Sequence, residues 1–112
     1  MQLDDDARLL HIREASEQAL DFVSGYSRPD FDTNRMLVFA LVKCVEIVGE
    51  AANSMSEAGR ARCPGIDWPA IIGMRHRLVH AYHDINLDVL WSTVTEDLPD
   101  VLAELRKAPP PA

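Results

Sequence analysis

The sequence predicts an all-α protein, an antiparallel bundle of four to five helices. Apolar residues recur at helical spacing in four stretches of the 112 residues. Between these stretches no segment shows the alternation of apolar and polar residues that a half-buried strand would have. The connections are short, which favours antiparallel neighbours. The length fits one helical domain over residues 1–107, followed by a proline-rich tail at 108–112.

The first two helices are predicted over about residues 4–24 and 33–56. Three aspartates lie in the first turn of the first helix, where the helix dipole favours carboxylates, and Gly25 and Pro29 end it. The second helix is apolar on almost every side of its middle, MLVFALVKCVEIVGEAA, and needs cover on two faces. A second copy of the chain is the economical second cover, and the alternative is that its own bundle covers it. Its polar positions form one narrow stripe: Lys43, Glu46, Glu50 and Asn53.

Two further helices complete the bundle. Asp67 is the predicted N-cap of a third long helix from Trp68 to about Tyr82, and a short helical turn and a loop with Pro and Gly precede it. The fourth helix covers about residues 87–107 and should kink at Pro99. The apolar residues expected to face the core are Ile71, Met74, Leu78 and Ala81 in the third helix and Val89, Leu90, Val94, Leu98, Val101, Leu102 and Leu105 in the fourth.

Charge and cysteine content limit the classes of function. A formal net charge of -7 argues against a broad basic surface for nucleic acid, so any contact with RNA must be local. The start of the chain is acidic, unlike a secretory signal, and its longest apolar run, MLVFALV, is too short to cross a bilayer. Cys44 and Cys63 have no metal-ligand spacing and are expected to be free thiols. A cytoplasmic protein with no membrane contact is predicted.

The stretch GMRHRLVHAY concentrates cationic and proton-transferring side chains in the third helix. On helical spacing Arg75 lies at one edge of the core face, whereas His76, His80 and His83 share a different arc. Arg75 and His80 are five positions apart, about 140° around an ideal helix, so they do not converge unaided. They could form one site in three ways: the long side chain of Arg75 reaches round the helix, the helix loosens near Ala81, or the two residues come from different subunits of a dimer.

Three interpretations of these residues stay open from spacing alone. In the first interpretation, Arg75 forms an ion pair with Glu46 or Glu50, and the histidines are ordinary polar residues. In the second interpretation, the three histidines bind zinc, for which imidazole is a suitable ligand. The third is metal-independent RNA cleavage, in which a neutral histidine takes the proton of a ribose 2′-OH and an arginine stabilises the charge developing on the phosphate.

Arg75, His80 and Tyr82 form an Arg-x4-His-x-Tyr motif. The motif resembles that of the HepT-like toxins of the HEPN superfamily, small helical proteins encoded beside a minimal nucleotidyltransferase antitoxin of the MntA type. Three further segments are similar to the family's segments in the same order, so the resemblance covers about residues 8–105. They are EIVGEAANSMSE, PGIDWPAIIGMR and INLDVLWSTVTEDLPDVL.

The resemblance implies a homodimer whose motif helices face one another across a cleft. It implies an endoribonuclease that needs no cofactor, in which Arg75 stabilises the phosphate and His80 transfers protons. It also implies that the MntA-type antitoxin silences the toxin by transferring AMP from ATP to the hydroxyl of Tyr82. A bulky nucleotide at the mouth of the cleft would exclude RNA.

One position departs from the family pattern. His76 stands where these proteins often have asparagine or aspartate, so it is a candidate additional catalytic residue or a replacement for an amide hydrogen bond. RNA binding would depend on a small basic patch, for which Arg77 and Lys43 are candidates beside Arg75. The main alternative function is a non-catalytic HEPN-type module that binds nucleotide or a partner, and the third is the zinc protein.

Overall fold

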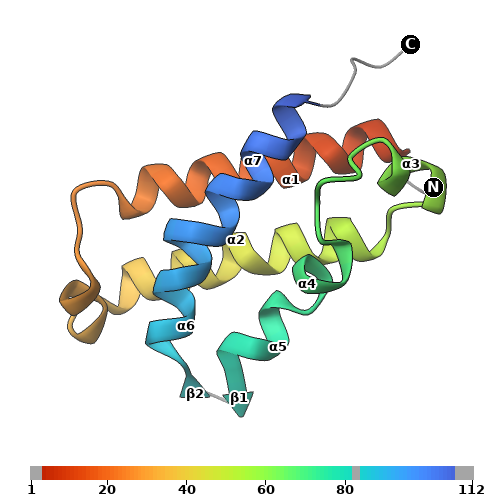
Figure 1. Cartoon of the computed structure of the whole chain (residues 1–112). Helices are drawn as coiled ribbons and strands as arrows, with labels where there is room; N and C mark the ends of the chain where they lie inside the picture. Colours follow the sequence, from red (N-terminus) through yellow and green to blue (C-terminus); the bar gives the residue numbers. More distant parts are fainter. Residues whose placement is uncertain (1–3, 82–83, 108–112) are drawn as a thin grey trace.

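Two long helices, α1 (Asp5–Val23) and α2 (Arg35–Asn53), run side by side in opposite directions (Figure 1). The structure is a computed structural model that describes residues 4–81 and 84–107, and for His80 and Ala81 it describes the backbone only. The elements in chain order are α1 (Asp5–Val23), the 3-10 helix η1 (Arg28–Asp32), α2 (Arg35–Asn53), α3 (Glu57–Ala61), α4 (Trp68–Ile72), α5 (Met74–Leu78), β1 (Val79–Ala81), β2 (Asp84–Ile85), α6 (Leu87–Ser92), the π-helical turn η2 (Thr93–Asp97) and α7 (Leu98–Lys107).

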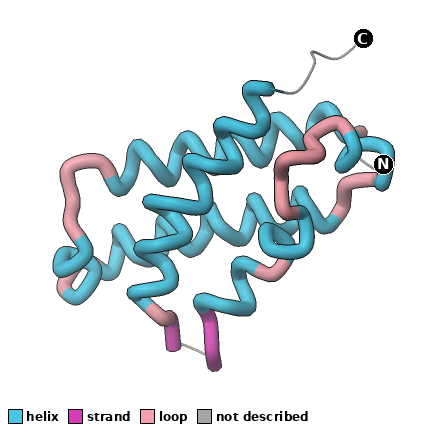
Figure 2. Tube along the Cα trace, viewed as in Figure 1, coloured by secondary structure: helices cyan, strands magenta, loops and turns pink. Residues whose placement is uncertain are grey.

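The predicted all-α class is confirmed, with one small addition. Strands β1 and β2 form a short antiparallel pair at one end of the molecule (Figure 2). The helices otherwise pack as a bundle, in which α7 lies against α1 while α4 and α5 lie against α2. None of the helices in the described ranges has the length and apolarity that a bilayer crossing requires. The predicted dimer stays a prediction.

A polar side chain fixes the start of five of the seven α-helices in the described ranges by accepting a hydrogen bond from a backbone N–H of the first turn. The predicted N-cap Asp67 is confirmed, since its carboxylate accepts from the N–H of Ala70 at 3.1 Å. The glycine that ends α1, Gly25, has a φ of 84°, a conformation that favours glycine. The other N-caps are Asp4 for α1, Asn34 for α2, Ser56 for α3 and Asn86 for α6.

The core lies where α1, α2, α4, α5 and the helix from α6 to α7 meet. The predicted core face of the third helix is confirmed for Ile71, Met74 and Leu78, which are buried. The predicted apolar side of the fourth helix is likewise buried at its central positions. The largest fully buried apolar side chains are Ile12, Leu41, Val45, Val48, Met74, Leu78, Leu90, Val94 and Leu98.

The prediction of one long third helix from Trp68 to Tyr82 is wrong. Gly73 separates α4 from α5, and α5 ends at Leu78 because Val79 takes up an extended conformation (φ -111°, ψ 103°). Val79 then pairs with Ile85 of β2, and the N–H of Asn86 donates to the carbonyl of Leu78 at 2.6 Å. β-branched valine suits an extended strand, and the partner strand supplies the hydrogen bonds that another helical turn would have made.

The fourth helix is continuous from α6 to α7, but a π-helical turn, η2, lies directly before the expected kink at Pro99. Proline has no N–H with which to continue an α-helical ladder, so a widened turn at this point relieves the conflict. In a regular α-helix, side chains four residues apart differ in direction by about 40°, so a row of residues at this spacing gradually turns away from the core. The wider turn reduces this drift and keeps Leu90, Val94 and Leu98 in the core.

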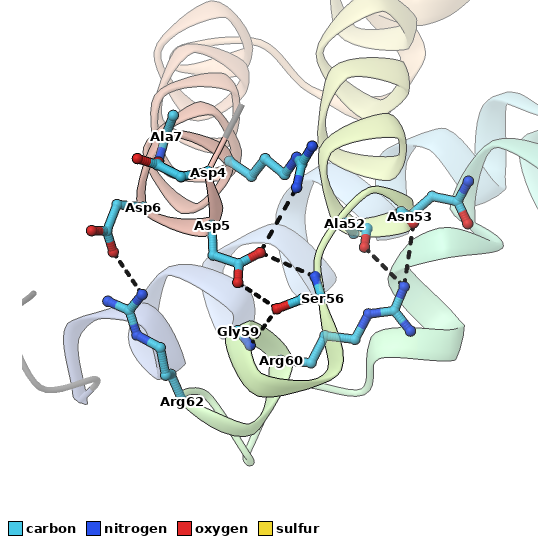
Figure 3. A network of polar contacts seen from close by, with 11 residues as sticks. Asp4, Asp5, Asp6, Ala7, Ala52, Asn53, Ser56, Gly59, Arg60 and Arg62 are labelled. Carbon is cyan, nitrogen blue, oxygen red and sulfur yellow. Dashed lines mark hydrogen bonds and ion pairs between the residues drawn. The ribbon is translucent and has the colours of Figure 1, made fainter. Parts of the chain in front are cut away.

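A network of polar contacts fastens the start of α1 to the loop between α2 and α3 (Figure 3). Asp5 accepts hydrogen bonds from the backbone N–H of Ser56 at 3.0 Å and from its hydroxyl. Asp6 accepts from the guanidinium of Arg62 at 2.6 Å, and Arg60 donates to the carbonyl of Ala52 at the end of α2. These contacts hold the C-terminal end of α2 in place.

Candidate functional site

The C-terminal half of α2 and the segment from α4 to α5 border an open groove of about 420 Å³. Three residues of the polar stripe predicted on the second helix, Glu46, Glu50 and Asn53, lie in one wall, and residues around the α4–α5 junction form the other. Gly49 of α2 faces the carbonyl groups of Ile71 and Ile72 at the end of α4. The lining residues are Glu46, Gly49, Glu50, Asn53, Ile72, Arg75 and His76.

Arg75 lies near the start of α5 and forms an ion pair across the groove. Its Nε donates to Oε1 of Glu46 at 3.1 Å, and the two side chains are 53% and 26% exposed. Of the two glutamates that the sequence offered as partners, the structure selects Glu46. Lys43 lies beside the pair, with its Nζ 4.0 Å from Oε2 of Glu46. Glu46 therefore stands between two exposed cations.

His76 lines the same groove as Arg75 and is exposed to solvent. The groove thus brings together a guanidinium, which binds phosphate oxygens, and an imidazole, which transfers protons near neutral pH. Glu46 and Glu50 balance the positive charges of Arg75 and Lys43, so the groove is not a strongly basic patch.

The other motif residues lie beyond α5. The backbone of His80 belongs to β1, and its side chain is outside the described part of the structure, as are Tyr82 and His83 entirely. Because the helix ends at Leu78, the prediction that His76, His80 and His83 share one helical arc is wrong. The expected separation of 140° between Arg75 and His80 does not apply either. Within the described residues, no group of histidine, cysteine, aspartate and glutamate side chains is arranged to hold a metal ion.

Arg77 lies away from Arg75, on the side of α5 that faces η2. Its guanidinium donates to the carbonyl of Ala70 at 3.2 Å and lies 4.0 Å from the carboxylate of Asp97. Burial raises the pKa of Asp97, and the nearby charge of Arg77 opposes this shift. The structure therefore places Lys43, but not Arg77, beside Arg75.

Sequence reasoning named Glu46 only as an alternative partner for Arg75. The signal that could have assigned it to the site was its place in the narrow polar stripe of an otherwise apolar helix. No local pattern identified Gly49 as a groove residue, because its position there depends on how α2 meets α4.

The fold and the groove define a small all-α protein that carries an Arg-x4-His-x-Tyr motif across the end of a short helix. Comparison with known families gives this class a name. The family profile described as "Ribonuclease HepT-like" matches residues 12–108, and the chain belongs to this family.

Similar proteins occur in archaea and bacteria. A "Probable ribonuclease HepT" of Thermococcus cleftensis is 33% identical over 86% of this chain and 87% of its own length. A protein of Methanocaldococcus jannaschii named "Putative RNase" is 30% identical over 88% of this chain and 91% of its own length. A second protein named "Putative RNase", from Caldanaerobacter subterraneus, is 30% identical over 88% of each chain. No solved structure shows significant similarity to this chain.

Proposed function

We propose that the protein is a metal-independent endoribonuclease and the toxin of a toxin–antitoxin pair. An MntA-type nucleotidyltransferase antitoxin would neutralise it by AMPylating Tyr82. The observation that carries the proposal is that Arg75, the first residue of the family motif, lines an open groove together with His76. Membership of the HepT-like ribonuclease family supports the same reaction class.

The proposed cleavage uses the 2′-OH of RNA as its own nucleophile. His80 takes the proton of the 2′-OH, the oxygen attacks the adjacent phosphorus, and the bond from phosphorus to the leaving 5′-oxygen breaks. An imidazolium returns a proton to that oxygen, and His76 is the candidate for this second role. Arg75 stabilises the charge that develops on the phosphoryl oxygens. The products are a 2′,3′-cyclic phosphate and a 5′-hydroxyl end.

Exposed apolar residues on α2 support the proposed homodimer. Met36 is 85% exposed and Phe39 is 52% exposed, although both belong to a helix that is apolar on almost every side. Large apolar side chains gathered on one face commonly mark an interface. Phe39 lines a pocket together with Asp84 and Ile85, which closely follow the motif segment in the sequence, so a second copy of the chain covering this face would lie near that segment.

RNA cleavage in the presence of EDTA is the direct test. Wild-type protein should cut a single-stranded RNA and leave 2′,3′-cyclic phosphate ends, while Arg75→Ala and His80→Ala should each lose activity about a hundred-fold or more. Arg13→Ala is the matched control, because Arg13 lies on α1 and forms an exposed ion pair with Glu17. Tight RNA or nucleotide binding without any cleavage would favour the non-catalytic module. Loss of activity with chelator would contradict the metal-independent mechanism.

The toxin role is tested by expression in bacteria. Wild-type protein should arrest growth, and the Arg75→Ala and His80→Ala variants should not. Co-expression of an MntA-type nucleotidyltransferase should restore growth. Equal harmlessness of the wild type and both variants would contradict the toxin role.

The modification is tested with purified nucleotidyltransferase and ATP. Attack of the Tyr82 phenol on the α-phosphorus releases pyrophosphate and adds about 329 Da for each AMP transferred. The chain has two tyrosines, and Tyr26 is 46% exposed, so Tyr26→Phe is a matched control that should still be modified. Tyr82→Phe should not be modified, and its modification would remove Tyr82 as the main acceptor.

A further inference from the structure

The ion pair between Arg75 and Glu46 leaves most of the guanidinium open. Nε of Arg75 donates to Oε1 of Glu46, and within the described ranges neither Nη group has a hydrogen-bonding partner. A guanidinium carries five N–H donors in a fixed fork. The contact occupies one of them and leaves the Nη groups available for the oxygens of a phosphate.

The pair matters more for the orientation of Arg75 than for the stability of the fold. Water screens an ion pair whose members are 53% and 26% exposed, so it contributes little to stability. An unrestrained arginine, in contrast, samples many rotamers and must lose that freedom when it binds a ligand. A carboxylate that holds Nε removes part of this entropy loss before the substrate arrives.

The charge of Glu46 also restricts where a phosphate can bind. Oε1 faces Arg75, and Oε2 lies 4.0 Å from Nζ of Lys43. A phosphate approaching the Nε side of Arg75 would meet this carboxylate and be repelled. Glu50, which lines the same groove, adds a second negative charge near α2. The Nη side of Arg75 is the side of the guanidinium that does not face Glu46.

We propose that Glu46 is a positioning residue, which holds the guanidinium of Arg75 through Nε and directs its Nη groups to the scissile phosphate of an RNA strand. The proposal rests on the ribonuclease function proposed above. Glu46 touches no reacting atom and acts only through Arg75. The ion pair between Glu46 and Arg75 is then part of the functional site and not only a structural contact.

A double-mutant cycle separates this role from a structural one. The variants are Glu46→Ala, Arg75→Ala and the combination, assayed on an RNA oligonucleotide under single-turnover and steady-state conditions. Glu46→Ala should lower kcat about ten- to a hundred-fold, with a smaller change in KM, because the arginine is no longer oriented. In the Arg75→Ala background it should cause no further loss. Glu46→Gln, which keeps an oxygen to accept from Nε, should recover most of the activity.

Controls keep the experiment interpretable. Glu17→Ala removes another exposed ion pair, on α1 and outside the groove, and should leave kcat unchanged. Circular dichroism melting reports whether each variant is folded. Should Glu46→Ala not fold, Glu46→Asp draws the carboxylate back by one methylene, and an unchanged kcat in that variant would overturn the proposal.

Different results would contradict the positioning role and the ribonuclease function. If Arg75→Ala loses activity but Glu46→Ala does not, or if Glu46→Ala causes the same loss with and without Arg75, the positioning role is wrong and the ribonuclease stands. If wild-type protein cuts no RNA, or Arg75→Ala cuts it as well as wild type, the proposed function fails and the positioning role fails with it.

Discussion

Asp5 accepts hydrogen bonds from both the backbone N–H and the hydroxyl of Ser56, so the first turn of α1 is fastened to the N-cap of α3 (Figure 3). The hydroxyl contact is the largest cause that lowers the pKa of Asp5, followed by the backbone contact. A carboxyl whose pKa is lowered on folding stabilises the fold above its unfolded pKa, and this contribution is lost as the pH falls towards the folded value.

Replacing Asp5 with asparagine should therefore lower the melting temperature at pH 7. The difference from wild type should narrow as the pH falls below about 3.9, the ordinary pKa of aspartate, because Asp5 then takes up a proton more readily in the unfolded chain than in the folded protein. Thermal melts between pH 7 and pH 2.5 measure this. Asp21→Asn makes the same charge change at an exposed position of α1, and its melting temperature should differ only slightly from that of wild type at each pH. If the difference in melting temperature between Asp5→Asn and wild type does not vary with pH, the ionised carboxylate of Asp5 does not stabilise the fold.

Trp68→Phe should destabilise the protein by about 1 kcal/mol, since it removes an indole N–H that donates to two carbonyl groups, each of which keeps a backbone donor. The indole Nε1 of Trp68 lies 3.1 Å from the carbonyl oxygen of Arg60 and 3.3 Å from that of Cys63, and the side chain is buried. Trp91→Phe is the matched control, because the half-buried Trp91 contacts Phe31 edge to face and should lose less. Urea denaturation followed by circular dichroism compares the two. An equal loss would show that the hydrogen bonds of Trp68 contribute nothing.

Two glycines should respond in opposite ways to alanine. A Cβ at Gly49 would lie 3.6 Å from the carbonyl oxygen of Ile71, an ordinary contact, so Gly49→Ala should stabilise α2 by about 0.5–1 kcal/mol. Gly25 has open space around it but a φ of 84°, so Gly25→Ala should cost about 1–2 kcal/mol of backbone strain. Urea titrations give both values. A loss of stability in Gly49→Ala would show that α2 and α4 cannot accept the methyl group.

Phe39→Glu should convert the proposed dimer to a monomer, because it removes a large apolar side chain from the interface and introduces a charge that loses hydration on association. Phe22→Glu introduces the same charge on α1, where the wild-type side chain is 43% exposed, compared with 52% for Phe39. Light scattering after gel filtration gives the mass of each. The Phe22 variant should stay dimeric, and a dimeric Phe39→Glu protein would place the interface elsewhere.

Much of the bundle could be predicted from local signals. The apolar spacing located α1, α2 and the helix from α6 to α7, and Asp67 marked the start of α4, because amphipathic periodicity and N-caps act within a few residues. The end of α5 could not be found this way. The helical pattern continues past Leu78, but Val79 pairs with Ile85 of β2, a contact that depends on the path of the chain between them.

The groove could be predicted only in part. The stripe on α2 and the motif arginine were visible in the sequence, and the choice of Glu46 over Glu50 as partner required the packing of α5 on α2. Arg77 is two positions from Arg75, which places it on the opposite side of a helix. Proximity in the sequence therefore suggested a shared basic patch that the structure separates.

The π-helical turn η2 has a consequence for how the length of this chain can vary. A π turn holds more backbone than the α turn that it replaces, so one residue in Thr93–Asp97 is in surplus relative to a regular helix. Deleting one residue from this turn would allow a regular α-helix to form through it, and no loop would become shorter. Engineered shortening of the C-terminal helix should accordingly begin inside the helix, one turn before its proline.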